Sequence, residues 1–483
     1  MLKNHDPRNA AIALGLMALV GVALIFLFPG SPEQDSGYHF EMARSAWHQP
    51  EYFVQVWARP FYTALFAIPA AFGLMAARFF AVAIGLGVAW QTWRLALDLK
   101  LRRPWLVVPL LLAQPSFFAL FPDLLTEPLF ALVFAIALRW HLRGWIMRGM
   151  LAASLLPLAR PEGVFLCLLW GLWVLAPALN HRRADGTFGS LLKAATPLVL
   201  LASGVFLWWL AALLITGDPL FILHSWPRQW QQGIYGRGSL FSYAGRSWEF
   251  AGPLLLVPLL AGLWQSLRLR AWIPITSSWL LFFILHTLFR KYGLFGEAGY
   301  PRYMVSVAPA TALLTLAGWD CLTGRIRDRS SLSAAGLGFT LFAVSITISF
   351  LYLDSLIWSR DAVAIREMKE WMQQGSRPVH RFLWSNVLMC RDHESNDFLD
   401  RPAFESNPEK KLELFRNSPP GTLVMWDDKI GPDWFGITAD KIQTAGYQLL
   451  RRRQYALRGI FLHRNIAGWK MTREVELTLL YKP

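Results

Sequence analysis

The chain has few cysteines and lacks the common motifs of nucleotide and zinc chemistry. It contains 3 Cys among 483 residues, at the widely spaced positions Cys167, Cys321 and Cys390. We therefore expect neither an intrachain disulfide framework nor a Cys-x-x-Cys metal pair. No Walker A, Gly-x-Ser-x-Gly or His-Glu-x-x-His pattern occurs in the sequence. A nucleotide-driven pump and a zinc protease are therefore disfavoured.

Acidic residues are also scarce relative to basic ones. The sequence has 47 Lys and Arg against 32 Asp and Glu, and its formal net charge is +15. Such an excess can indicate nucleic-acid binding. Most of it, however, falls in short loops between apolar runs, such as Lys100 to Arg103 and Arg139 to Arg148. This is the positive-inside bias of membrane proteins, so we expect a lipid bilayer as partner and no nucleic acid.

Apolar segments make up most of the sequence up to about Leu353. Hydrophobic residues make up 54% of the chain, and runs recur that are long enough to cross a ~30 Å hydrocarbon core. The first run ends without a small-residue cleavage pattern, so we expect an uncleaved span with a cytoplasmic N-terminus. We predict an α-helical, multi-pass protein of the plasma (inner) membrane. About eleven spans are expected, beginning near Ala10, Ala77, Pro104, Thr126, Gly149, Gly163, Leu191, Gly252, Trp272, Tyr303 and Ser333.

The segment from Gly149 to Ala178 allows two topologies. It can form a short helical hairpin with Arg160-Pro161-Glu162 at its outer tip. It can instead form one long span with both charges at mid-depth, which would reverse the orientation of every later span. Because a charge inside the bilayer costs at least ~2.5 kcal/mol on insertion scales, we favour the hairpin.

Three long loops are then expected on the outer side, at residues 30–76, 216–250 and 290–302. The first loop contains two segments with helical character, Gly37 to Trp47 and Phe61 to Met75, which we predict to lie on the membrane surface. The second loop is rich in aromatic and basic residues, as is typical of a headgroup interface.

The composition changes at Asp354, where apolar runs shorten and charges rise. We predict a membrane domain over 1–353 and an extracytoplasmic α/β domain over 354–483. Within the second domain we expect an amphipathic helix and three strands, at Asp361 to Trp371, Gly421 to Trp426, Tyr447 to Leu450 and Val475 to Tyr481.

Asp35 is the leading catalytic candidate. It lies directly after the first span, between the acids Glu33 and Glu41. A carboxylate there can accept a proton from a sugar or lipid hydroxyl. The alternative is a structural role as the N-cap of a helix that begins at Ser36-Gly37.

The turn residues Glu127, Arg160 and Glu162 are the next candidates. Thr126-Glu127-Pro128 predicts a helix start, with an acid favoured by the helix dipole, although Glu127 would also face the same compartment as Asp35. Arg160 and Glu162 can form an internal ion pair, or Arg160 can bind an anionic headgroup while Glu162 orients it. The sequence leaves these alternatives open.

Further candidates lie in the later outer loops: His224, Arg228, Arg237, Arg302 and Tyr303. The basic residues among them can be interfacial side chains that extend toward water. They can also stabilise the charge of a leaving phosphate.

Several short motifs resemble those of the GT-C superfamily of integral membrane glycosyltransferases, above all bacterial members related to polyprenyl-phosphate-mannose and aminoarabinose transferases. The resemblance covers roughly residues 10–353, and its strongest signal is the order and placement of the motifs. The motifs are Gln34 to His39, Arg59-Pro60-Phe61-Tyr62, Ala77-Arg78, Thr126-Glu127-Pro128, Ala159 to Gly163, Gly217 to Leu220 and Pro301-Arg302-Tyr303.

The resemblance implies an inverting enzyme that moves a sugar, such as mannose, from a polyprenyl-phosphate carrier to a hydroxyl of a lipid, glycan or protein. It implies Asp35 as general base and Glu127, Arg160 and Arg302 as substrate contacts. The family motif often pairs two acids, whereas Ser36 follows Asp35 here. Whether the protein binds a divalent cation such as Mg²⁺ or Mn²⁺ is therefore left open. If it does, Asp35 and Glu33 are the expected ligands.

Two other classes are considered. A carrier or flippase for polyprenyl-linked sugars would place Arg160 and Glu162 on a transport path, but no repeated halves are evident. A non-catalytic scaffold that presents the C-terminal domain does not explain the acids and arginines of the outer loops.

Overall fold

In the computed structural model, two compact units are formed. The first holds the described residues of Met1–Pro29 and Met42–Leu353, and the second holds those of Gly30–Glu41, Asp354–Arg464 and Lys470–Pro483. The structure describes residues 6–27, 34–185, 195–227, 230, 235–324, 340, 343–349, 360–373, 377–385, 408–428, 431–456 and 474–483.

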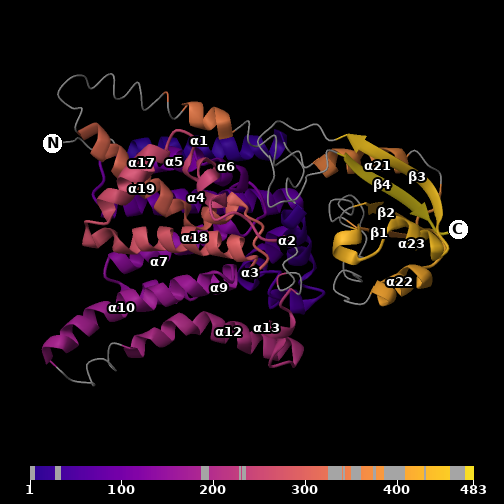
Figure 1. The fold of residues 1–483 in the computed structure, drawn as a ribbon, viewed down its shortest axis with the longest axis horizontal. Helices are drawn as coiled ribbons and strands as arrows, with labels where there is room; N and C mark the ends of the chain where they lie inside the picture. Colours follow the sequence, from indigo (N-terminus) through magenta and orange to yellow (C-terminus); the bar gives the residue numbers. More distant parts are fainter. Residues whose placement is uncertain are drawn as a thin grey trace. The chain divides into compact units, whose positions relative to one another are not determined.

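The first unit is helical throughout its described part. Figure 1 shows its long helices running along a common direction. In chain order the helices are α1 (Asp6–Leu27), α2 (Gln34–Ser45, which begins in the second unit), η1 (Pro50–Phe53), α3 (Pro60–Ala71), α4 (Leu74–Asp98), η2 (Pro104–Leu106), α5 (Val107–Leu112), α6 (Pro115–Leu120), α7 (Glu127–Leu142), α8 (Ile146–Ala153), α9 (Leu156–Ala159), α10 (Gly163–Asp185), η3 (Thr196–Leu198), α12 (Val199–Thr216), α13 (Phe221–His224), α15 (Ser242–Gly245), α16 (Trp248–Ala251), α17 (Leu256–Ser266), η4 (Arg270–Trp272), α18 (Ile273–Tyr292), η5 (Pro301–Val307) and α19 (Ala308–Gly324).

Helices of membrane-spanning length and composition occur five times among the described residues: Pro7–Leu27, Leu74–Asp98, Thr196–Thr216, Arg270–Tyr292 and Pro301–Thr323. Four of them begin near predicted span starts. The predicted starts at Leu191 and Ser333 both fall at residues outside the described ranges. The total of about eleven spans therefore stays a prediction.

The segment around Arg160 forms a helical hairpin. Helix α9 ends at Ala159 and α10 begins at Gly163, and the two arms pack against each other, since the Cys167 thiol donates to the Ala153 carbonyl at 3.3 Å. The residue before a proline avoids the helical conformation, and Arg160 is accordingly extended, at φ −158° and ψ 136°. The helix therefore ends here because Arg160 is followed by Pro161.

Glycine allows the closest helix contacts in the first unit. A Cβ on Gly262 of α17 would lie 1.9 Å from the Leu314 carbonyl oxygen of α19, and one on Gly318 would lie 1.8 Å from the Pro258 carbonyl oxygen. Small residues at such crossings are how helices in lipid gain packing contacts. The backbones of α17 and α19 therefore meet directly.

The second unit contains a small mixed sheet flanked by helices. Strand β1 (Arg381–Trp384) runs parallel to β2 (Thr422–Asp427), and β4 (Glu474–Tyr481) pairs antiparallel with both β2 and β3 (Gln448–Ala456), in the order β1-β2-β4-β3. Every residue of β2 is buried, as expected for a central strand covered on both faces. The helices are α21 (Arg360–Gln373), α22 (Pro408–Asn417), the π-helix η9 (Gly431–Phe435) and α23 (Ala439–Thr444).

The expected α/β character of the C-terminal segment is confirmed. The predicted helix and three strands correspond to α21, β2, β3 and β4, while β1 was not predicted from its four residues. The predicted domain bounds, 1–353 and 354–483, stay a prediction.

Candidate functional site

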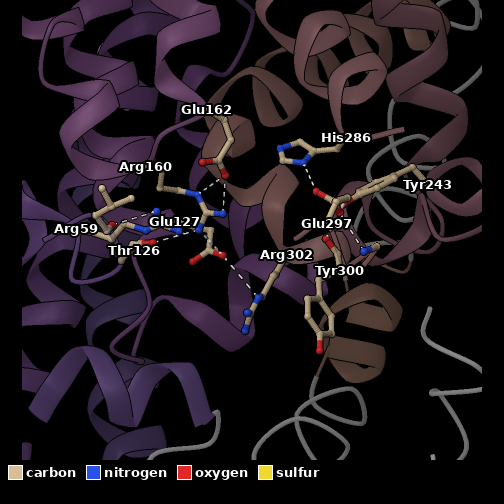
Figure 2. Close-up of polar contacts among 12 residues, drawn as sticks. Arg59, Thr126, Glu127, Arg160, Glu162, Tyr243, His286, Glu297, Tyr300 and Arg302 are labelled. Carbon is tan, nitrogen blue, oxygen red and sulfur yellow. Dashed lines mark hydrogen bonds and ion pairs between the residues drawn. The ribbon is translucent and has the colours of Figure 1, made fainter. Parts of the chain in front are cut away.

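Charged side chains from helix ends and turns far apart in the sequence meet in the first unit, and Figure 2 shows their contacts. We call Arg59, Glu127, Arg160, Glu162 and Arg302 the arginine–glutamate cluster. Its residues come from the turn before α3, the start of α7, the α9–α10 turn and η5. All are buried except Glu162, which is 12% exposed.

Arg160 stands at the centre of this cluster. Its Nη1 lies 2.8 Å from Glu127 Oε1, and its Nη2 lies 2.6 Å from Glu162 Oε1. The Arg160 Nε also donates to Glu162 Oε1 at 2.8 Å. Most of its N–H groups are therefore committed to protein partners, so the internal ion pair expected as one alternative is present.

The start of α7 supplies two partners of Arg160. Thr126 is the N-cap, Pro128 follows in the first turn and Glu127 lies where the helix dipole favours an acid. The Thr126 hydroxyl does not cap its own helix. It accepts instead from Arg160 Nη1 at 3.1 Å. The predicted helix start is correct; Glu127 belongs to the cluster and Thr126 holds its central arginine.

Helix η5 adds a second guanidinium and aromatic rings. Arg302 Nε lies 3.6 Å from Glu127 Oε1, and its guanidinium carbon stands 4.7 Å from the centre of the Tyr300 ring. The Tyr303 ring lies 5.1 Å from the guanidinium carbon of Arg160. Aromatic faces attract cations, so η5 holds both arginines in place.

Arg59 contributes a third cation with an unusual backbone. Its φ is +60°, a left-handed conformation that costs an ordinary residue about 1–3 kcal/mol and persists where the surroundings enforce it. The guanidinium carbon lies 5.0 Å from the ring of Trp230 and 5.8 Å from that of Trp57. Among the described residues Arg59 has no ion-pair partner; its hydrogen bond goes to the Val56 carbonyl at 3.4 Å.

Burial and neighbouring charges together set the protonation states in the cluster. Burial alone would raise the pKa of Glu162, but the positive charges of Arg160 and Arg59 outweigh it and lower that pKa to about 2. Burial, together with the charge of Arg160, lowers the pKa of Arg59 to about 10. Arg59 and Glu162 therefore stay ionised at neutral pH.

A second buried network adjoins the first, and we call it the His286 network, made of His286, Glu297 and Tyr243. The Glu297 carboxylate accepts from the Tyr243 hydroxyl at 2.6 Å and from the Gly299 amide at 3.0 Å, and its other oxygen lies 2.7 Å from His286 Nδ1. The ring of His286 stacks on that of Tyr303 at 5.2 Å. Tyr303 therefore contacts both the His286 network and Arg160.

Several predicted site residues are not members of the arginine–glutamate cluster. Asp35 is in the first turn of α2, which starts at Gln34, so it is not the N-cap of a helix beginning at Ser36-Gly37. It belongs to the second unit, whereas the cluster belongs to the first. His224, 63% exposed, pairs with Asp218 at 2.6 Å. Arg237 is exposed. Glu33 and Arg228 lie outside the described residues.

For a divalent cation, which the sequence leaves open, there is no ready set of ligands in the described part of the chain. No group of three or more His, Cys, Asp or Glu side chains there could hold a metal ion. Glu127 and Glu162 are each held by Arg160, whose positive charge opposes cation binding.

The sequence-based prediction assigned no role to Arg59, His286 or Tyr243. Arg59 stood in a quoted motif, Arg59-Pro60-Phe61-Tyr62, and its side chain could have been grouped with the other outer-loop arginines. His286 lies inside an apolar helix. An ionisable residue in such a helix is a functional candidate by default, and this signal could have identified it.

The chain has a helical GT-C fold, as predicted, and its match to solved structures shows this fold. Two solved structures of ArnT from Cupriavidus metallidurans share this fold. The first, bound to undecaprenyl phosphate, matches with a TM-score of 0.62 at 14% identity over 97% of each chain. The apo structure matches with a TM-score of 0.58 at 14% identity, over 97% of this chain and 98% of that one. In sequence, no family model and no curated protein matches.

Proposed function

We propose that the protein is an integral membrane glycosyltransferase that takes a sugar from a polyprenyl-phosphate carrier and moves it to a hydroxyl group. The observation that carries the proposal is the arginine–glutamate cluster, where three guanidiniums meet two carboxylates within a GT-C fold. The two acids leave one positive charge uncompensated within this set, which suits a single anionic group. The ArnT structure bound to undecaprenyl phosphate supports a lipid phosphate as that group.

The arginines have different roles in this proposal. Arg160 positions the site, because its N–H groups already serve Glu127, Glu162 and Thr126. Arg302 and Arg59 are the proposed phosphate contacts. Arg302 Nε lies 3.6 Å from Glu127 Oε1, beyond normal hydrogen-bond length, and Arg59 has the single backbone partner described above. Planar guanidinium groups match phosphate oxygens well.

The proposed reaction is a displacement with inversion. The acceptor oxygen attacks the anomeric carbon, the bond between that carbon and the phosphate oxygen breaks, and polyprenyl phosphate leaves with the electron pair. The arginines stabilise the charge that develops on the leaving phosphate. The proton of the acceptor hydroxyl passes to a general base, for which Asp35 is the proposed residue. The proposal keeps mannose as the first sugar to test, and a lipid, glycan or protein as acceptor.

The proposed location is the inner membrane, with the N-terminus in the cytoplasm and the C-terminal domain outside. The helices of spanning length support membrane insertion. In this orientation the loops rich in Lys and Arg face the cytoplasm, while the arginine–glutamate cluster is near the outer surface.

The first experiment measures lipid binding and sugar transfer side by side. Purified protein in nanodiscs is titrated with undecaprenyl phosphate, and membranes are incubated with radiolabelled undecaprenyl-phosphate-mannose. We expect Arg302→Gln to weaken binding of undecaprenyl phosphate roughly 10- to 100-fold, because a charge-assisted contact is lost. Arg148→Gln is the matched control, since Arg148 is exposed at the start of α8.

The outcomes separate the parts of the proposal. Normal transfer by Asp35→Asn would remove Asp35 as base without affecting the lipid site. Binding of undecaprenyl phosphate with no transfer of mannose, pentose or amino-sugar label would favour the carrier alternative. Equal binding by wild type and Arg302→Gln would remove Arg302 as a phosphate contact.

A further inference from the structure

The His286 network leaves one buried ring nitrogen without a protein partner. His286 is 1% exposed, and among the described residues its Nε2 has no hydrogen-bond partner. In Figure 2 this second nitrogen lies on the side of the ring that faces Glu162, away from Glu297. A buried polar atom of this kind is destabilising unless a ligand or water satisfies it.

The contacts of Glu297 determine which hydrogen bonds His286 can make. The carboxylate accepts from the Tyr243 hydroxyl and the Gly299 amide through Oε1, so Oε2 is left to face His286 Nδ1 at 2.7 Å. An ionised Glu297 carboxylate can only accept hydrogen bonds. Nδ1 must therefore carry the ring proton and donate a hydrogen bond to Oε2. In the neutral ring, Nε2 is then a hydrogen-bond acceptor.

The surroundings of His286 limit which kinds of ligand group can donate a hydrogen bond to Nε2. Aromatic rings line the imidazole, with Phe282 at 5.5 Å, Tyr243 at 5.9 Å and Tyr303 at 5.2 Å between ring centres. Tyr303 also lies against Arg160, so His286 and the arginine–glutamate cluster share the contact with one aromatic ring. An acceptor in this position repels phosphate oxygens and selects a group that carries a proton. Aromatic walls combined with a few placed polar groups are typical of small-molecule sites.

We propose that His286 Nε2 accepts a hydrogen bond from a hydroxyl of the sugar on the donor lipid, so that the His286 network recognises the sugar while the arginines hold the phosphate. This inference rests on the proposed function and deepens it. It makes His286 a binding residue and assigns Glu297 and Tyr243 the role of fixing the ring's tautomer and orientation.

The test compares two ligands on the same protein. Wild type and His286→Phe in nanodiscs are titrated with bare undecaprenyl phosphate and with undecaprenyl phosphate linked to a hexose, a pentose or an amino sugar. Phe keeps an aromatic ring against Tyr303 but has no acceptor. We expect His286→Phe to bind the bare lipid as wild type does and to lose about tenfold in affinity for the preferred sugar-linked lipid.

Glu297→Gln gives an independent test that leaves His286 in place. The amide oxygen should take the Oε1 position, where two donors point. The amide nitrogen then faces His286 Nδ1 and donates to it, which moves the ring proton to Nε2. A sugar hydroxyl can still accept from the Nε2 proton, so we expect this variant to weaken the preference for the sugar-linked lipid rather than abolish it. His286→Gln, which keeps an acceptor, should also retain part of the preference.

Each outcome bears on one proposal. Equal affinity of wild type and His286→Phe for every sugar-linked lipid would overturn the inference. So would a wild-type protein that binds none of them more tightly than bare undecaprenyl phosphate, and this result would leave the lipid site standing. If wild type binds neither kind of lipid, the proposed function itself fails.

Discussion

Removal of the Arg160 guanidinium is expected to leave two carboxylates close together without their main counter-charge. Glu127 is 1% exposed and Glu162 is 12% exposed. Breaking a buried ion pair by removing one partner typically costs about 3–5 kcal/mol. Because Arg302 stays 3.6 Å from Glu127, we expect Arg160→Met to lie at the lower end, about 3 kcal/mol.

The assay is thermal unfolding in nanodiscs at pH values from 7 to 4. In the wild type the folded-state pKa of Glu162, about 2, lies below its ordinary value of 4.5, so its stabilising contribution is complete above pH 4.5 and is lost as the pH falls toward 2. In Arg160→Met, burial acts on Glu162 without this cation and raises its folded-state pKa. The difference in melting temperature between the two proteins should therefore shrink as the pH falls. A difference that stays constant from pH 7 to 4 would refute the electrostatic explanation.

A matched combination separates lost charge from lost packing. Arg160→Met together with Glu127→Gln and Glu162→Gln removes the whole ionic set, and most of the stability should return, with coupling of about 1–3 kcal/mol between the sites. A triple variant as unstable as Arg160→Met alone would assign the loss to the contact between Arg160 and the Tyr303 ring.

Three further predictions concern packing, hydrogen bonding and ligand binding. Gly262→Ala should lower the free energy of unfolding by about 1–3 kcal/mol because its Cβ would overlap the Leu314 carbonyl. Gly15→Ala, whose Cβ meets nothing within 4 Å, is the control. Equal melting temperatures of the two variants would contradict the contact. Thr126→Val should cost about 1 kcal/mol by removing an acceptor for Arg160, whereas Thr126→Ser should melt like wild type. Arg59→Lys should weaken undecaprenyl phosphate binding roughly three- to tenfold, because Lys cannot stack on Trp57 and Trp230 as a planar guanidinium does. Unchanged binding in the same titration would remove Arg59 as a phosphate contact.

Local sequence rules predicted the helix ends that a few neighbouring residues determine, and missed a strand that depends on a distant partner. Thr126-Glu127-Pro128 marked the start of α7 because capping and proline effects act within a few residues. The Arg160-Pro161 pair marked the hairpin turn for the same reason. Strand β1 was missed because four residues carry too little periodicity to indicate a strand, and its place depends on pairing with β2, about forty residues later.

The candidate site depended on contacts that no local pattern records. Arg160 and Glu162 could be paired from their spacing, but the approach of Arg302 to Glu127 follows from how η5 packs against α7. His286 looked like one polar residue in an apolar helix, and only the turn that ends at Gly299 brings Glu297 to its ring. The types of residue near the site could be predicted from the sequence. Their contact partners could be identified only in the folded structure.

The spacing of the Arg160 contacts also has a consequence for the order of assembly. Arg160 and Glu162 are 2 residues apart, whereas Arg160 and Thr126 are 34 residues apart. Short loops close in tens of nanoseconds and at little entropic cost, while contacts between distant segments wait for the intervening chain to be arranged. We therefore infer that the hairpin tip neutralises its own charges first, and that Glu127 and Arg302 join a pair that has already formed.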